Sequence, residues 1–205
     1  ADASESYAVT VSDGSLSSSA DLVGNLTGAS DAPTLTTPAA IALTDTAAND
    51  TFANTTGNLS GADRDTGATL SYGITSGTDG GTTVSLVGTY GTLTVTKSSG
   101  AYTFVANASA INALTADASE SYAVTVSDGS LSSSANLVVN LTAANDTPTL
   151  TTPTAIALTD TAANDTFANT TGNLSGADRD PGATLNYGIT SGTYGGTTVS
   201  LVGSY

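Results

Sequence analysis

The feature that most constrains the fold of this 205-residue chain is an internal repeat. Residues 1–90 recur as residues 116–205, a shift of 116 − 1 = 115, and ten of the ninety aligned positions differ. Near-identity over so long a stretch indicates tandem duplication of a whole domain. A period of 115 residues is too long for a solenoid unit and close to the ~100 residues of a β-sandwich domain.

Polar, proline-bearing segments mark the borders between the copies. "ASDAPTLTTPAA" (29–40) and "AANDTPTLTTPTA" (143–155) lie between strand-like runs and are typical of linkers. They divide the chain into the C-terminal part of one repeat (1–33), one complete repeat (34–147) and the N-terminal part of the next (148–205). Because the sequence opens in mid-pattern, we expect it to be a piece of a longer protein.

Alternating apolar and polar residues predict an all-β fold. Val, Leu, Ile, Tyr and Thr, which favour strands, dominate the patterned stretches. In the complete repeat we predict strands at 40–43, 51–59, 68–75, 82–87, 92–97, 101–106, 121–127 and 131–141, with one helical turn in 107–118. Such a series of short antiparallel strands predicts tandem immunoglobulin-like, cadherin-like β-sandwich domains. The aromatic residues expected in the core are Tyr72, Tyr102, Phe104 and Tyr122.

Composition excludes several classes of function. Eighteen acidic residues against three basic ones give a net charge of −15, which repels nucleic acid and anionic membranes. No Cys, His, Met or Trp is present, so thiolate chemistry and His-based catalysis are impossible. No apolar run approaches the ~20 residues that a membrane-spanning helix needs. We expect no enzymatic activity, no small-molecule substrate and no membrane insertion.

The acidic residues gather in a few loops, and the most distinctive is an Asp-Arg-Asp turn. It occurs in "SGADRDTGATLSYGI" (60–74) and again in "SGADRDPGATLNYGI" (175–189). Successive loops of an antiparallel sandwich alternate between its two poles. At the first pole of the complete repeat we therefore group the linker acid with the acids of two loops, namely Asp31, Asp63, Asp65 and Asp128.

The opposite pole collects a second group. It contains residues of the first loop, of the segment before the penultimate strand, of the exit linker and of the next Asp-Arg-Asp turn: Asp45, Asp50, Asp117, Glu120, Asn145, Asp146, Asp178 and Asp180. In the partial copies, the counterparts of residues in this group are Asp2, Glu5, Asp160 and Asp165, and Asp13 is the counterpart of Asp128 in the first group. The grouping requires that segment 82–87 be a side strand that leaves the overall chain direction unchanged.

Carboxylates packed this closely repel one another and call for a cation. At about 4 Å each pair costs roughly 1 to 4 kcal/mol, depending on the effective dielectric constant. Ca²⁺ suits the composition because it takes six to eight oxygen ligands in flexible geometry. Mg²⁺ demands stricter octahedral geometry, and zinc or copper prefers the His and Cys that this chain lacks. We therefore predict Ca²⁺ at the junctions between repeats.

These motifs carry a resemblance to known repeats. "GADRDTGATLSYGI", "YAVTVSDG" and "NDTPTL" resemble the calcium motifs of cadherin repeats: Asp-x-Asp-x-Gly before a strand, Asp-Gly after a late strand, and an Asn-Asp-x-Pro linker. "ALTADASESY" stands where cadherins have a Leu-Asp-Arg-Glu motif, and matches it poorly. "GTYGTLTVTKSSGAYTFVANASAINAL" is similar to the VCBS-type repeats of giant bacterial RTX adhesins, and the resemblance covers essentially the whole chain.

The resemblance implies a calcium-rigidified extender that holds a distal adhesive domain away from a bacterial cell. It further implies type I secretion, a location at the cell surface, and neighbouring identical repeats as partners. The alternative is a module that binds ice, sugar or a protein directly. The many Thr residues invite this idea, although Thr is also simply a good strand residue. A third alternative is an enzyme that hydrolyses glycosides with paired carboxylates. Such sites need an aromatic-lined cleft, and only 5% of the residues are aromatic.

Overall fold

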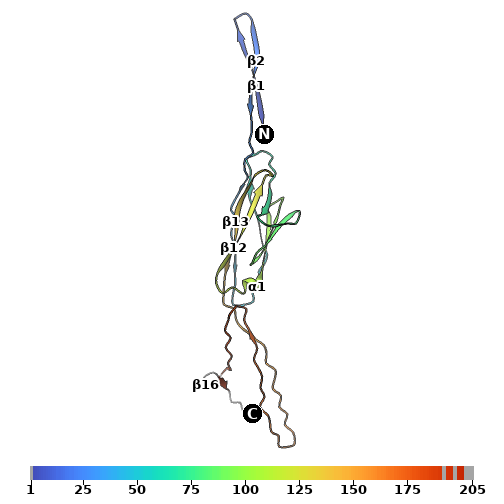
Figure 1. Cartoon of the computed structure of the whole chain (residues 1–205), viewed down its shortest axis with the longest axis vertical. Helices are drawn as coiled ribbons and strands as arrows, with labels where there is room; N and C mark the ends of the chain where they lie inside the picture. Colours follow the sequence, from blue (N-terminus) through green and yellow to red (C-terminus); the bar gives the residue numbers. More distant parts are fainter. Residues whose placement is uncertain (1, 191–192, 196–197, 201–205) are drawn as a thin grey trace. The chain divides into compact units, whose positions relative to one another are not determined.

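A computed structural model describes residues 2–190, 193–195 and 198–200. The last five residues assigned above to the third repeat, 201–205, lie outside the described residues. The central part of the chain, shown in Figure 1, is built from short strands and one helical turn. Its elements are β3 (Thr34–Leu35), β4 (Ile41–Thr44), β5 (Thr55–Asn58), β6 (Gly61–Ala62), β7 (Ser71–Ile74), β8 (Thr78–Asp79), β9 (Thr83–Val87), β10 (Gly91–Thr96), β11 (Ala101–Ala106), α1 (Ala108–Ile111), β12 (Ala118–Ser127) and β13 (Ser132–Thr142).

Two sheets form a β-sandwich. One has the strand order β5-β11-β10-β9-β8 and the other the order β4-β13-β12-β7. The strands pair in antiparallel fashion, for example with Val124 opposite Ile74 and Thr94 opposite Ser85. The prediction of an all-β sandwich fold is thereby confirmed.

Strict alternation builds the core of the sandwich, because every second side chain of a strand points to the same face. In β10 and in the second half of β12, buried residues alternate with half-buried ones. The rings of Phe104 and Tyr122, from different sheets, meet edge to face with centroids 5.9 Å apart, a favourable aromatic geometry. Both rings are buried, as the sequence predicted.

The strand predictions match the observed strands to within a few residues except at 51–59. There β5 covers only Thr55–Asn58. The preceding residues form a loop that is tied to the helix turn, since the Asp50 amide donates to Asn112 Oδ1 at 2.8 Å. At this end of the segment, a hydrogen bond to the Asn112 side chain therefore takes the place of pairing with another strand.

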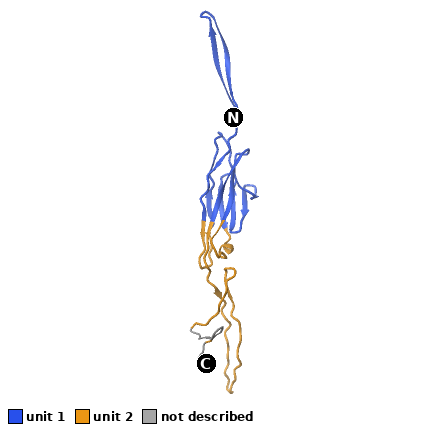
Figure 2. Ribbon diagram, turned by 60° about the vertical axis from the view of Figure 1, so that its left-hand side comes forward, with its two compact units in different colours: residues 1–41, 54–105, 120–139 blue, residues 42–53, 106–119, 140–205 orange. Residues whose placement is uncertain are grey.

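The chain divides into two compact units, coloured in Figure 2. The first comprises residues 1–41, 54–105 and 120–139, and includes the hairpin of β1 (Ala3–Ser12) and β2 (Ser17–Leu26). This hairpin is a two-stranded sheet, and no third strand of the described residues pairs with it. The first unit contains most of the sandwich core, including Leu93, Val95 and Val124.

The second unit comprises residues 42–53, 106–119 and 140–205. Its buried residues include Ile111, Leu141 and three aspartates. Beyond residue 147 its strands are short: β14 (Thr149–Leu150), β15 (Gly176–Ala177), β16 (Thr193–Gly195) and β17 (Thr198–Ser200). Residues 156–159 and 186–189, which repeat the sequences of β4 and, apart from one residue, β7, are not strands here.

Candidate metal centre

The acidic residues around the two linkers form two clusters. We call Asp31, Asp63, Asp65 and Asp128, all in the first unit, the first seam. We call Asp45, Asp117, Asn145, Asp146, Asp178 and Asp180, all in the second unit, the second seam.

In each copy, an equivalent two-stranded sheet joins the linker to its Asp-Arg-Asp turn. β3 pairs with β6, with Thr34 opposite Ala62, and β14 pairs with β15, with Thr149 opposite Ala177. The threonine hydroxyl adds a bond of 3.1 Å to the opposite carbonyl in both copies. The backbone then turns through a glycine at positive φ, 85° at Gly67 and 86° at the equivalent position of the second copy, where a side chain is disfavoured.

This pairing orients the aspartates identically in both seams. The Asp31 amide donates to Asp65 Oδ2 at 2.8 Å, and the Asp146 amide donates to Asp180 Oδ2 at 2.7 Å. Within each turn, the amide of the second aspartate donates to Oδ1 of the first, at 2.8 and 2.9 Å. The Asp-x-Asp spacing therefore holds two carboxylates beside the linker aspartate.

In the first seam the carboxylates have donors. The Ser30 hydroxyl lies 3.2 Å from Asp65 Oδ2 and 3.3 Å from Asp128 Oδ2. The Asp128 carboxylate also caps its own turn, and the amides of Leu131 and Ser130 lower its pKa. Asp31 is exposed. One buried oxygen, Asp63 Oδ2, has no hydrogen-bond partner among the described residues.

The second seam buries its charges. Asp146 is 0% exposed, Asp45 3% and Asp180 8%. The loop that begins at Asp45 closes on the linker: the Asp45 amide donates to the Thr142 carbonyl at 2.9 Å, and the Thr147 amide donates to the Ala47 carbonyl at 3.1 Å. Three carboxylates, one each from the loop, the linker and the Asp-Arg-Asp turn, are thus withdrawn from water.

These buried carboxylates lack partners. Both side-chain oxygens of Asp146, Oδ1 of Asp45 and Oδ1 of Asp180 make no hydrogen bond among the described residues. A buried ionised carboxylate without a partner costs several kcal/mol. Four unpaired oxygens from three carboxylates are ligands of the kind that a hard, oxygen-seeking cation takes, so the chemistry of these residues fits part of a Ca²⁺ ligand set.

The pKa of the Asp45 carboxyl is raised, which reflects the same unfavourable burial of charge. Burial raises its pKa, and the Asp146 and Asp50 charges raise it further, while the Ala144 amide, 3.4 Å from Asp45 Oδ2, opposes them. A raised pKa means that the folded protein disfavours the ionised form. A cation bound among these oxygens has the opposite effect, because it favours the ionised form of the carboxyl.

The carboxylates do not yet converge on one point. Among the residues that the structure describes, no group of three His, Cys, Asp or Glu side chains has the spacing of a metal-ligand set. Like charges at close range cost energy in a medium of low dielectric constant, so carboxylates without an ion between them favour such a separation. Binding an ion therefore requires side-chain rotations that bring the oxygens of Asp45, Asp146 and Asp180 inward.

Other predicted residues lie around this centre. Asp117 Oδ1 accepts from the Ala143 amide at 2.9 Å, and the Asn145 side-chain amide donates to the Asp146 carbonyl at 3.1 Å. Asp50 binds the Thr46 amide at 2.6 Å through Oδ2. These contacts shape the linker and the loop at the rim of the second seam.

Glu120 lies elsewhere. Its carboxylate accepts from the amides of Thr89 and Tyr90 at 2.6 and 3.1 Å, and the Tyr122 hydroxyl lies 2.9 Å from it. All four residues belong to the first unit. Glu120 therefore holds the turn between β9 and β10, and the structure does not bring it to the second seam.

The acids of the partial copies make local contacts. Asp2 accepts from the Gly28 amide at 3.0 Å, as Asp117 does from the equivalent Ala143, and Glu5 accepts from the Tyr7 hydroxyl. Asp13 caps its turn through the amides of Leu16 and Ser15, which lower its pKa. Asp165 binds the Thr161 amide at 2.5 Å and has a lowered pKa for that reason, and Asp160 is exposed.

Sequence reasoning missed two residues. Asn112 is 2% exposed and bridges the helix turn to the 49–51 loop, with bonds of 2.8 and 3.0 Å to the backbone of Asp50. Its only signal was a polar residue inside an otherwise apolar stretch. The other is Ser30, which stands where the second linker has Asn145; its hydroxyl joins Asp65 to Asp128.

Comparisons with known proteins add little to this geometry. No family model matches the sequence, and no curated protein does either. Among solved structures, one match is an endo-fucoidan hydrolase from glycoside hydrolase family 107, at 23% identity and a TM-score of 0.33. The match covers 69% of this chain and 19% of the enzyme, so the chain spans about a fifth of that protein's length. A likeness this weak carries no argument about activity.

Over the residues that the structure describes, no helix has the length and apolarity to cross a membrane.

Proposed function

We propose that this chain is a calcium-rigidified extender, a structural spacer of a bacterial cell-surface adhesin. The observation that carries the proposal is the set of unpaired buried oxygens of Asp45, Asp146 and Asp180. Bound Ca²⁺ supplies the positive charge that lets these carboxylates pack together without water. The partners of each repeat are its identical neighbours in the same chain.

The residues themselves explain how such a junction stiffens. Asp45 belongs to the loop of one repeat, Asp146 to the linker, and Asp180 to the turn of the next repeat. Asp146 contributes twice, because its amide already binds Asp180 while its carboxylate remains free. When all three carboxylates share one charge centre, a change of angle at the linker must break several ligand bonds at once. The linker then loses the freedom of a hinge.

The proposed location rests on the resemblance to RTX adhesin repeats and on charge. Extracellular calcium modules bind at roughly 10⁻⁴ to 10⁻³ M, so external fluids saturate them whereas the cytosol does not. Without the ion, the buried carboxylates oppose folding, which keeps the chain loose before export. We assign no catalytic role and no small-molecule substrate to the acidic seams, and a directly ligand-binding adhesion module remains the alternative.

A calcium titration of the whole chain tests the proposal. Calorimetry is expected to show binding in the range given above, and small-angle scattering is expected to show a chain that becomes more flexible after chelation. Asp146→Asn, which keeps the shape and removes the charge, is expected to abolish the tightest binding event. Mg²⁺ at the same concentration is the control, because its stricter octahedral geometry fits a linker site poorly. Scattering curves that coincide with and without calcium, together with no measurable heat, contradict the proposal.

A further inference from the structure

The loop that brings Asp45 to the linker is held at its far end by one buried side chain, Asn112. This residue is 2% exposed and lies directly after α1, as the C-cap of that helix turn. Its side-chain oxygen accepts from the Asp50 amide at 2.8 Å, and its side-chain nitrogen donates to the Asp50 carbonyl at 3.0 Å. Both main-chain polar groups of Asp50 are thus paired with one side chain, as they would be with a residue of a neighbouring strand.

The orientation of the Asn112 side chain is itself fixed. Its nitrogen also donates to the Ala108 carbonyl, four residues earlier, at 2.7 Å. Because a carbonyl only accepts hydrogen bonds, this contact requires the NH₂ end of the side chain to face the helix turn. With three bonds in a buried site, Asn112 has little freedom to rotate, and it therefore fixes Asp50 relative to α1.

Hydrogen bonds rather than packing hold the outer side of this loop. A cavity of about 420 Å³ adjoins it, and the residues that line the cavity include Asn49, Asp50, Thr51, Asn112 and Arg179. Asn49, Thr51 and Arg179 are exposed. Because this space is open, a loop released from Asn112 has room to move away from the linker.

From Asp50 the restraint passes along the loop to Asp45. The Asp50 carboxylate accepts from the Thr46 amide at 2.6 Å and from the Thr46 hydroxyl at 3.1 Å. The same two bonds form in the second copy of this sequence, at 161–165, so the turn is specified by local residues. Asn112 therefore sets where the turn lies, and Asp45, the residue before Thr46, is positioned with it.

The other end of the loop closes on the linker through main-chain bonds. The Asp45 amide donates to the Thr142 carbonyl at 2.9 Å, and the Thr147 amide donates to the Ala47 carbonyl at 3.1 Å. Two such bonds on one side leave a loop free to swing unless its far end is also fixed. With Asn112 in place the loop is held at both ends, and Asp45 is only 3% exposed.

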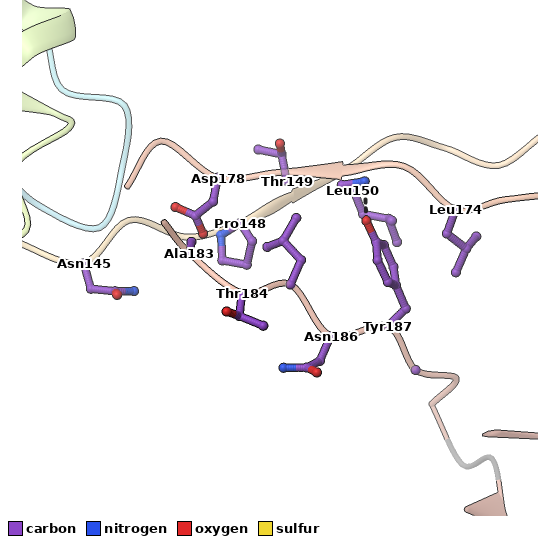
Figure 3. A pocket seen from close by; sticks show the side chains of 13 residues that line it. Asn145, Pro148, Thr149, Leu150, Leu174, Asp178, Ala183, Thr184, Asn186 and Tyr187 are labelled. Carbon is purple, nitrogen blue, oxygen red and sulfur yellow. Dashed lines mark hydrogen bonds between the residues drawn. The ribbon is translucent and has the colours of Figure 1, made fainter. Parts of the chain in front are cut away.

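The other two carboxylates of the second seam have a support that does not involve Asn112. The Asp146 amide donates to Asp180 Oδ2 at 2.7 Å, and β14, within the linker, pairs with β15. Figure 3 shows this part of the chain, where Thr149 and Asp178 lie on the two neighbouring segments. Loss of the Asn112 bonds is therefore expected to displace only the carboxylate that the loop carries.

We propose that Asn112 is a positioning residue of the candidate metal centre, which ties the 45–51 loop to the helix turn and so holds Asp45 beside Asp146 and Asp180. The inference rests on the proposed function, since it gives Asn112 a part in calcium affinity. A released loop lowers the fraction of molecules in which all three carboxylates can share one ion. The apparent dissociation constant rises by the inverse of that fraction.

Two substitutions of Asn112 remove the contacts in different ways. Leucine fills a similar volume but pairs with neither the amide nor the carbonyl of Asp50. Serine is too short to reach both groups, and the space that it leaves admits water, which satisfies them without fixing the loop. Asn112→Ser is therefore the variant of choice where Asn112→Leu does not fold.

Amide exchange measured by NMR and calcium calorimetry of the full chain test the proposal. In EDTA, both variants are expected to lose protection at the amides of Asp45, Asp50 and Thr147, while the amides of β12 remain protected. With calcium added, they are expected to bind the ion about tenfold more weakly than the wild type, in line with a loop that is closed for about a tenth of the time.

Ile111→Val is the matched control. Ile111 is 0% exposed in the same helix turn, so the smaller side chain weakens packing there without removing a bond to Asp50. This variant is expected to melt at a lower temperature than the wild type. Its calcium affinity, and the exchange of its loop amides relative to those of β12, are expected to match the wild type, which separates positioning from general loss of stability.

Two results overturn the inference. One is unchanged protection of the loop amides in folded Asn112 variants, and the other is wild-type calcium affinity in variants whose loop amides exchange freely. Failure of the proposed function is distinguishable, because in that case the wild type itself binds no calcium. The exchange measurement in EDTA then still decides whether Asn112 holds the loop.

Discussion

The two seams have the same linker geometry, but their linker carboxylates differ in exposure to water. Asp31 and Asp146 occupy equivalent positions, and each amide binds the second aspartate of its turn, at 2.8 and 2.7 Å. Asp31 is nevertheless exposed, while Asp146 is fully buried and its carboxylate has no hydrogen-bond partner among the described residues. A motif of a dozen residues thus fixes the orientation of a carboxylate without fixing its environment.

The difference arises from what closes over the linker. At the second seam the loop from Asp45 to Ala47 binds the linker backbone and removes water. At the first seam, Ser30 and the Asp128 turn face the same carboxylates, and the hydroxyl supplies donors. Among the described residues, closure by the 45–47 loop therefore distinguishes the second seam from the first.

The largest expected effect is that of chelation, and it separates the seams. At a calcium concentration of a hundred times the dissociation constant, one site contributes about 2.7 kcal/mol, which corresponds to a fall in melting temperature of about 10–20 °C when EDTA is added. Hydrogen exchange is expected to show a larger loss of protection at Asp146 and Thr147 than at Asp31. Equal losses at both linkers mean that the comparison between the seams is wrong.

Replacing the linker aspartates one at a time is expected to give effects of different size and sign. With calcium present, Asp146→Asn is expected to lower the free energy of unfolding by about 2–3 kcal/mol, because it removes a buried ligand. In EDTA the same change is expected to raise it by about 1 kcal/mol or more, since an uncompensated buried charge disappears.

Asp31→Asn is the matched control for this substitution. Asp31 is exposed, so the change is expected to stay within about 0.5 kcal/mol in EDTA. Urea unfolding of both variants, with and without calcium, measures all four values. Loss of stability for Asp146→Asn in EDTA is incompatible with the account of the second seam.

The pH dependence of stability in EDTA isolates Asp45. Its pKa is raised, chiefly by burial, so the folded state binds a proton more tightly than the unfolded state. The penalty is absent below the unfolded pKa of 3.8, grows as the pH rises through the folded pKa, and is complete above it. Relative to Asp45→Asn, the wild type is expected to lose stability as the pH rises from about 4 to 7. A flat difference between the two proteins shows that Asp45 is not electrostatically strained.

The smallest expected effect concerns the serine of the first seam. Ser30→Ala removes the hydroxyl that joins Asp65 to Asp128 and is expected to lower the melting temperature by no more than a few degrees. Ser30→Asn introduces the residue of the second linker and is expected to behave like the wild type within that range. Thr37→Ala, at an exposed linker position, is the control. A drop as large as that caused by chelation contradicts the view that the first seam is the less demanding one.

Much of the fold was accessible from the sequence because local patterns specified it. The hairpin of β10 and β11 was predicted within one residue at each end, since alternation and the Ser-Ser-Gly turn coincide there. The grouping of Asp31, Asp65 and Asp128 at one pole agrees with the contacts that Ser30 and the Asp31 amide make. Glu120 could not be placed, because its partners lie about thirty residues away in a turn without a distinctive sequence.

The sequence alone determined the period, the strand order along the chain and the positions of the acidic turns, because these depend on residues close together. Burial and strand identity were decided by tertiary structure. The letters Ile-Ala-Leu-Thr are strand β4 at 41–44 and no strand at 156–159, since a strand exists only where another strand accepts its hydrogen bonds. In the same way Asp146 is buried and Asp31 is exposed, because the 45–47 loop that excludes water from Asp146 comes from a distant part of the chain.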